Sequence, residues 1–251
     1  MPAASTQPRL VFHVLPPSHP CATVEAALKL KGLEYEKVEF APGQHIDAMT
    51  ELYGSHTVPG LLVDDEPVHG SNPIMERLEA IAPAPTLYPA DRADAVRAAA
   101  AWGDAELQDL GRRLPWGALY FRPEALGTFT PGGTPLDPAG TDYAIRFVRG
   151  TMKYHRLTMV QVAEDLQRLP ALLDQVDAYV SDGLLAGAAP NAADLQIGAT
   201  LSVLLTVGDI RALIESRPAV AVARKWFEDR PGIVPAGAFP AGWAPSTSHP
   251  A

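Results

Sequence analysis

The 251-residue chain is poor in cysteine and in long apolar runs, and each shortage excludes a class of protein. A single cysteine rules out an internal disulfide and a metal site built from several cysteines. The longest nearly apolar stretch, residues 197–207, is far shorter than the roughly 20 residues that a membrane helix needs. The first ten residues lack the basic stretch and apolar segment of a secretory signal. We therefore expect a cytoplasmic protein without a membrane segment.

Positive charge is also scarce. Lys and Arg number 20 against 29 Asp and Glu, which gives a formal net charge of −9. An acidic chain without basic blocks is a poor candidate for binding nucleic acid or an anionic membrane. No glycine-rich phosphate-binding spacing stands where a strand would lead into a helix, so we predict no nucleotide, haem or metal site. The 47% hydrophobic content nevertheless predicts a packed globular fold of one or two domains.

Proline, in contrast, is abundant at 25 residues, and its distribution places the loops. Recurring prolines predict a linker over residues 83–90, between an N-terminal domain at 9–82 and a helical domain at 91–230. The Pro-, Gly- and Ala-rich tail, 231–251, is predicted to be irregular. Residues 122–140 are rich in Pro and Gly, which predicts a long loop that covers a site or is locally disordered.

Hydrophobic periodicity predicts different secondary structure on the two sides of that linker. Short apolar or alternating runs predict strands, and apolar positions at helical spacing predict helices. In the first domain the resulting order is βαβαββα, with strands at 10–15, 35–40, 61–63 and 67–69 and helices from 20, over 46–53 and from 71. The second domain is predicted to be all-helical, with helices over 91–114, 141–156, 160–181, 191–206 and 217–229.

Four short elements, in this order and spacing, resemble those of the glutathione S-transferase superfamily. They are Ser18-His19-Pro20-Cys21 before a helix, Thr57-Val58-Pro59 before a strand, Gly70-Ser71 at the start of the third helix, and Asn191-Ala192-Ala193-Asp194 before an apolar helix. The resemblance covers residues 9–230, and the segment 102–106 looks like a bacterial branch of the superfamily. It implies a thioredoxin-like domain followed by an all-α bundle, glutathione as co-substrate, a small electrophilic second substrate and a homodimer.

The resemblance implies that Ser18 donates a hydrogen bond to the thiolate of bound glutathione. A helix N-terminus, with free N–H groups and a partial positive charge, stabilises such an anionic sulfur. A simple capping role is the alternative for Ser18. Cys21 either forms a mixed disulfide with glutathione or is a small, partly buried helix residue. His19 stands beside the thiol site as a candidate glutathione contact, although an exposed loop histidine is the plainer interpretation.

Thr57, Val58 and Pro59 are candidate glutathione-binding residues by the same resemblance. It implies a cis bond before Pro59, and pairing of the Val58 backbone N–H and C=O with the cysteinyl part of the ligand. The alternative is an ordinary trans proline at a strand edge.

Gly70 and Ser71 complete the implied glutathione site. The Ser71 hydroxyl and the free N–H groups of its helix would bind the γ-glutamyl carboxylate. The superfamily usually carries an acidic residue before this serine, and this chain has Gly70 instead. His45 and His56 lie in the segment where relatives often supply a cation for the glycyl carboxylate.

The second domain is expected to supply the electrophile pocket, with aromatic residues either as its walls or as core: Trp102, Trp116, Tyr120, Phe121 and Tyr143. Asp194 is expected to cap its helix. Three functions stay open from these residues. The first is a glutathione transferase, the second a thiol–disulfide oxidoreductase that uses Cys21, and the third a non-catalytic binding protein on the same scaffold.

Overall fold

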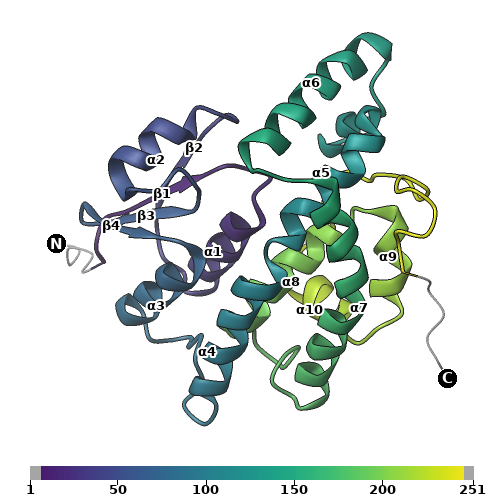
Figure 1. Cartoon of the computed structure of the whole chain (residues 1–251). Helices are drawn as coiled ribbons and strands as arrows, with labels where there is room; N and C mark the ends of the chain where they lie inside the picture. Colours follow the sequence, from purple (N-terminus) through teal and green to yellow (C-terminus); the bar gives the residue numbers. More distant parts are fainter. Residues whose placement is uncertain (1–6, 246–251) are drawn as a thin grey trace. The chain divides into compact units, whose positions relative to one another are not determined.

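The computed structural model describes residues 7–245, and its N-terminal part is a four-stranded mixed sheet with three helices (Figure 1). The strand order is β2-β1-β3-β4. β1 is parallel to β2, and β3 is antiparallel to both β1 and β4. The strands are β1 Leu10–Val14, β2 Glu36–Glu39, β3 Gly60–Val63 and β4 Glu66–His69. The predicted βαβαββα order is confirmed.

The helices of this part are α1 His19–Leu30, α2 His45–Tyr53 and α3 Ser71–Ile81. α1 packs against α3, whereas α2 contacts β4. Figure 1 shows α1 and α3 below the sheet and α2 above it. Large apolar side chains between these layers are fully buried, among them Phe12, Leu28, Met49, Leu61, Ile74 and Leu78.

Local sequence explains where these elements begin and end. β1 is buried along its whole length, as expected for a central strand made of a short apolar run. α1 ends before Gly32, whose φ of +62° suits the left-handed conformation that commonly closes a helix. Asp64 and Asp65, with φ of +49° and +70°, form the two-residue turn between β3 and β4.

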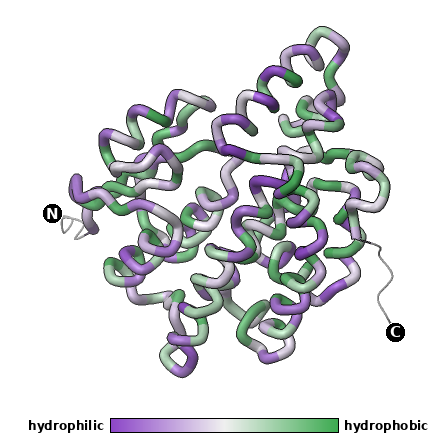
Figure 2. The backbone as a smooth tube through the Cα atoms, in the orientation of Figure 1, coloured by the Kyte–Doolittle hydropathy of each residue, from purple (hydrophilic) through white to green (hydrophobic). Residues whose placement is uncertain are grey.

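Residues 93–226 are mainly helical, as predicted, and no helix follows Trp226 within the described residues. The elements are α4 Ala93–Trp102, a π-helical turn Gly103–Leu107, α5 Leu110–Phe121, a 3₁₀ helix Pro123–Phe129, α6 Pro138–Tyr154, α7 Met159–Ser181, α8 Ala192–Leu204, α9 Gly208–Glu215 and α10 Val220–Trp226. Figure 2 shows hydrophobic and hydrophilic positions alternating along these helices, which is the pattern of helices with one buried face.

Two predicted elements differ from the structure, and one helix of the structure was not predicted. The helix predicted over 91–114 is interrupted by the turn at Gly103–Leu107, where a Cβ on Gly103 would lie 2.8 Å from the Ile197 side chain. The loop predicted over 122–140 contains the 3₁₀ helix and the start of α6, which Asp137 caps by accepting from the Gly140 N–H at 2.8 Å. α9 was not predicted.

Contacts divide the chain into two compact units. The first runs to Asp104 and includes Ala188–Ala199, and the second comprises Ala105–Gly187 and continues from Thr200. Between α3 and α4, Leu87 and Tyr88 are buried. The predicted domain boundary at residues 83–90 remains a prediction, and part of the predicted tail, residues 246–251, lies outside the described residues. No helix within residues 7–245 is long and apolar enough to cross a membrane.

Candidate functional site

The sheet register brings three of the predicted site segments to one edge of the first unit. His13, near the end of β1, pairs with Gly60 at the start of β3, and Gly60 pairs with His69 at the end of β4. The segments that follow β1, precede β3 and follow β4 therefore leave the sheet at the same edge. These segments carry Ser18, residues 57–59 and residues 70–71.

Ser18 is the N-cap of α1. Its half-buried Oγ accepts a hydrogen bond from the Cys21 N–H at 3.4 Å. Because the Oγ accepts from the backbone, the hydroxyl proton is available to donate. The first turn of α1 contains no acidic side chain, so nothing within that turn opposes the partial positive charge of the helix N-terminus. His19 is buried, which corrects the expectation of an exposed loop histidine.

Cys21 lies in the first turn of α1 and is buried. Burial raises the pKa of its thiol to about 11, although the hydrogen bond with Ser18 acts in the opposite direction. A thiol with that pKa is almost entirely protonated at neutral pH. This is the environment of a structural cysteine rather than of a reactive one.

The Val58–Pro59 bond is cis, as the resemblance implies. Among the described residues, neither the N–H nor the C=O of Val58 has a hydrogen-bond partner. The neighbouring carbonyls are occupied, since Thr57 O lies 2.9 Å from His69 Nε2 and Pro59 O accepts from the Gly70 N–H at 3.0 Å. Val58 thus offers one free donor and one free acceptor at the end of the sheet, as an extended peptide ligand requires.

Gly70 is the N-cap of α3 and has a φ of +90°. That conformation favours glycine, which gives a physical reason for the absence of the usual acidic residue here. The next residue, Ser71, is 3% exposed, and its Oγ has no hydrogen-bond partner among the described residues. A buried hydroxyl without a partner is costly, so its persistence at a helix N-terminus points to an anionic ligand.

His45 is the first residue of α2 and is buried. The parallel pairing of β1 with β2 ends with Val14 opposite Glu39, so the chain that leads into α2 starts from the same sheet edge. Burial and the nearby His56 lower the pKa of His45. A neutral imidazole can donate a hydrogen bond to a carboxylate but supplies no charge.

The structure adds residues that the sequence did not single out. His13 Nδ1 lies 2.8 Å from the Tyr53 hydroxyl, and His69 Nε2 lies 3.1 Å from Thr57 Oγ1 as well as contacting the Thr57 carbonyl. Burial lowers the pKa of His13 and raises that of Tyr53. These partners stand 40 and 12 positions apart, and only the folding of the first unit brings them together.

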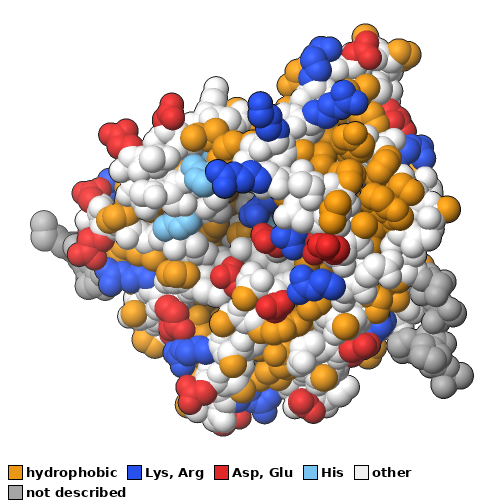
Figure 3. Space-filling model, in the orientation of Figure 1, with side chains coloured by type: hydrophobic (Ala, Val, Ile, Leu, Met, Phe, Trp, Pro, Cys, Tyr) orange, Lys and Arg blue, Asp and Glu red, His pale blue; other side chains and the backbone are white. Residues whose placement is uncertain are grey.

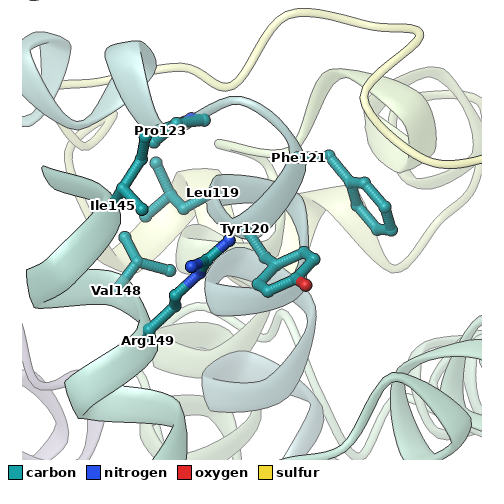
Figure 4. A pocket seen from close by; sticks show the side chains of 7 residues that line it. All are labelled: Leu119, Tyr120, Phe121, Pro123, Ile145, Val148 and Arg149. Atoms are coloured by element: carbon teal, nitrogen blue, oxygen red, sulfur yellow. The ribbon is translucent and has the colours of Figure 1, made fainter. Parts of the chain in front are cut away.

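Two of the predicted pocket walls, Tyr120 and Phe121, line a cavity of about 230 Å³ in the second unit (Figure 4). The remaining lining residues are Leu119, Pro123, Ile145, Val148 and Arg149. The Arg149 guanidinium lies 5.9 Å from the centre of the Tyr120 ring. Figure 3 shows hydrophobic side chains gathered on the visible face near α5.

The other three predicted walls do not line this cavity. Trp116 and Tyr143 both pack on Phe147, edge-on at 5.9 Å and stacked at 6.1 Å respectively. Trp102 ends α4 in the first unit. Within residues 7–245, no three His, Cys, Asp or Glu side chains are placed to hold a metal ion.

Comparison with known proteins agrees with this arrangement. Residues 12–86 match the model of the glutathione S-transferase N-terminal domain. A glutathione S-transferase from Rhodospirillum rubrum F11 is 23% identical, with 86% of this chain and 85% of that chain covered and a TM-score of 0.53. Beta-etherase LigF from Sphingobium sp. strain SYK-6 is 20% identical, with 86% and 93% covered and a TM-score of 0.64. Rice GST1 (OsGSTU1), solved in complex with glutathione, is 18% identical, with 90% and 92% covered and a TM-score of 0.53.

A thioredoxin-like sheet with its helices, followed by a series of helices, is the architecture of the glutathione S-transferase fold. Residues 12–86 belong to the glutathione S-transferase N-terminal domain family, and the chain has the fold of the glutathione S-transferase superfamily. The resemblance seen in the sequence is thereby confirmed. No curated protein matches the chain in sequence.

Proposed function

We propose that the protein binds glutathione as a thiolate and transfers it to a small electrophilic apolar substrate. The thiol would lie at the N-terminus of α1, where the Ser18 hydroxyl donates a hydrogen bond to the sulfur and the thiol proton goes to solvent. The thiolate then attacks an electrophilic carbon, a C–S bond forms, and the leaving group departs with its electron pair. Lowering the pKa of the bound thiol and aligning the two reactants supply the rate enhancement.

One observation carries this proposal: the polar groups without partners in the first unit match a short peptide with a carboxylate. Val58 offers an N–H and a C=O, and Ser71 offers a buried hydroxyl at the start of α3. The register places both segments at the edge where Ser18 caps α1. We also propose a homodimer, which light scattering of the purified protein would test.

The structure weighs against the thiol–disulfide alternative. Disulfide exchange needs a cysteine thiolate that is accessible to the disulfide. Cys21 is buried, and burial raises its pKa to about 11. Binding without catalysis remains the second candidate, because the free groups of Val58 and Ser71 favour ligand binding whether or not chemistry follows.

Calorimetric titration of the full chain with reduced glutathione tests the proposal. We expect binding to the wild type, and a Kd raised about tenfold by Ser71→Ala, which loses one hydrogen bond to the charged carboxylate. Because the Ser71 hydroxyl has no partner in the protein, this variant should keep or raise the melting temperature. Ser216→Ala, which removes a hydroxyl that donates to Leu213 O in α9, is the matched control and should leave the Kd unchanged.

A folded wild type that shows no heat of binding would contradict the proposal. Binding without any conjugation of chlorodinitrobenzene or other electrophiles would favour the non-catalytic alternative.

A further inference from the structure

A histidine holds the backbone next to the free groups of Val58. His69 Nε2 lies 2.9 Å from the Thr57 carbonyl oxygen. A carbonyl only accepts, so Nε2 must carry the proton and donate it, and this holds for the neutral and the charged imidazole alike. Because Gly70 N–H occupies the Pro59 carbonyl, the carbonyls on both sides of Val58 are held from the end of β4.

The Tyr53 ring packs beside the His69 ring. The Tyr53 ring lies 6.2 Å from the His69 ring, centre to centre, and a Cβ added to Gly60 would come within 2.5 Å of Tyr53. The absence of a side chain at Gly60 therefore lets Tyr53 pack closely on the strand. His13 Nδ1 fixes the Tyr53 hydroxyl at 2.8 Å, and burial lowers the pKa of His13, which keeps that imidazole neutral and able to accept.

Thr57 completes the chain of contacts. Its Oγ1 lies 3.1 Å from both His69 Nε2 and Ser55 Oγ. Since His69 Nε2–H is the donor, the Thr57 hydroxyl accepts from it and donates to Ser55. A series of contacts thus leads from His13 through Tyr53 and His69 to the Thr57 carbonyl. The three rings come from β1, α2 and β4 in turn.

We infer that His69 is a positioning residue for glutathione. By binding the Thr57 carbonyl, it fixes the orientation of the Thr57–Val58 peptide, so that the Val58 N–H, which belongs to the same peptide unit, faces the ligand rather than its own chain. This inference rests on the proposed function. His69 touches no ligand in this scheme, and its effect reaches the ligand only through the backbone of residues 57 and 58.

The test compares two substitutions of His69 in the full chain. His69→Leu removes the donor, whereas His69→Gln places an amide N–H close to the Nε2 position. We expect His69→Leu to raise the KM and the Kd for glutathione roughly tenfold, the effect of one misaligned pair of hydrogen bonds, with kcat changed less than about twofold. His69→Gln should restore both constants to within about threefold of the wild type.

Val68→Ala is the matched control. It trims a half-buried side chain on the same strand without touching the Thr57 carbonyl, so it should lower the melting temperature and leave the KM unchanged. If His69→Leu and His69→Gln raise the KM equally, or if Val68→Ala raises it as much, the role is structural and the inference is wrong.

Two further outcomes separate this inference from the proposed function. A wild type that binds glutathione while His69→Leu binds equally well overturns the inference and leaves the proposed function intact. A wild type that does not bind glutathione overturns both. If His69→Leu does not fold, the nitrogen NMR resonances of the wild-type imidazole decide, since an unprotonated Nε2 contradicts the contact on which the inference depends.

Discussion

At the scale of single residues, Ser18 and Cys21 show how position within one helix turn decides the chemistry of a side chain. Ser18 caps α1 and stays half-buried with a proton to donate. Cys21, three residues later, is buried, and its pKa is raised to about 11. The sequence predicted that both lie at the start of a helix, but it did not decide which of them acts on the thiol of glutathione. Burial distinguishes them, and burial depends on the packing of the whole unit.

Ser18→Ala should change the pH dependence of conjugation. Without its hydroxyl, the bound thiol loses a donor that favours the thiolate, so the acid limb of the kcat/KM profile should move up by about one pH unit. The variant also loses an N-cap, which costs about 1 kcal/mol of stability.

Thr158→Ala separates these two effects, because Thr158 caps α7 in the second unit through a complete capping box. It should lower stability by a similar amount and leave the pH profile in place. A profile of Ser18→Ala that overlays the wild type would show that Ser18 only caps α1.

Cys21 should react slowly in the folded protein. A pKa near 11 instead of 9.0 leaves about a hundredfold less thiolate at neutral pH, and burial further restricts access. We expect iodoacetamide to label native Cys21 more than tenfold more slowly than it labels the urea-unfolded chain, as followed by mass spectrometry. Labelling at equal rates would restore the thiol–disulfide alternative.

At the scale of elements, local signals predicted most of the fold. The apolar run of residues 10–15 and the alternation of residues 35–40 identified their strands correctly, because each signal lies within the element that it specifies. The order of short motifs then identified the superfamily fold.

The misses depend on contacts distant in sequence. The residues around Gly103 do not predict the π-helical turn, which occurs where the Gly103 backbone lies close to the Ile197 side chain. α9 begins at Gly208, and its Asp209 carboxylate accepts from the backbone N–H groups of Ala238 and Phe239, each at 2.9 Å. The same holds for the candidate site, where the sequence identified Ser71 by its motif but not His69, whose role appears only once β3 and β4 pair.

The N-terminus of α8 is held by three hydrogen bonds between Asn191 and the next residues. Asn191 Oδ1 accepts from the Ala193 N–H at 2.9 Å and the Asp194 N–H at 3.1 Å, and Asp194 Oδ2 accepts from the Asn191 N–H at 3.1 Å. This reciprocal pattern is the capping box that the sequence predicted. Asp194 is fully buried, so its hydrogen bonds do not compete with water.

Asp194→Ala should therefore destabilise the protein by about 2 kcal/mol, since it leaves the buried Asn191 N–H without its acceptor. Urea denaturation measures the change. Asp94→Ala, which removes an exposed carboxylate from the first turn of α4, should cost less than about 0.5 kcal/mol. Equal effects of the two substitutions would mean that the box contributes no more than a surface charge.

At the scale of the whole molecule, the net charge is −9, but the pH dependence of stability depends on individual groups whose pKa changes on folding. Burial lowers the pKa of His13 and of His45. The pKa of Glu79 is also lowered: its burial acts against ionisation, but the Lys31 ammonium, the Thr86 hydroxyl and the Leu87 N–H outweigh it. Lys31 Nζ, fully buried, lies 2.6 Å from Glu79 Oε2 and joins α1 to the end of α3.

All three groups bind protons more weakly in the folded than in the unfolded state, so their contributions to stability have the same sign. Each contribution is complete above the unfolded pKa and is lost as pH falls through the folded one. The free energy of unfolding should therefore be flat near neutral pH, begin to fall below about pH 6.5 as the two histidines must charge, and fall again below about pH 4.5 as Glu79 protonates. We expect a total loss of roughly 2 kcal/mol by the second stage, measured by urea denaturation at a series of pH values.

Glu79→Gln should remove the second stage selectively. The variant is less stable at neutral pH, because Lys31 stays buried without its carboxylate partner, but its stability should change little below about pH 4.5. Glu66→Gln removes an exposed carboxylate that pairs with Arg77, and it should retain both stages. A Glu79→Gln curve that still falls below about pH 4.5 as steeply as the wild type would assign the acid sensitivity to other paired carboxylates whose pKa is lowered, namely Glu25, Glu124 and Glu215, instead of the Lys31 pair.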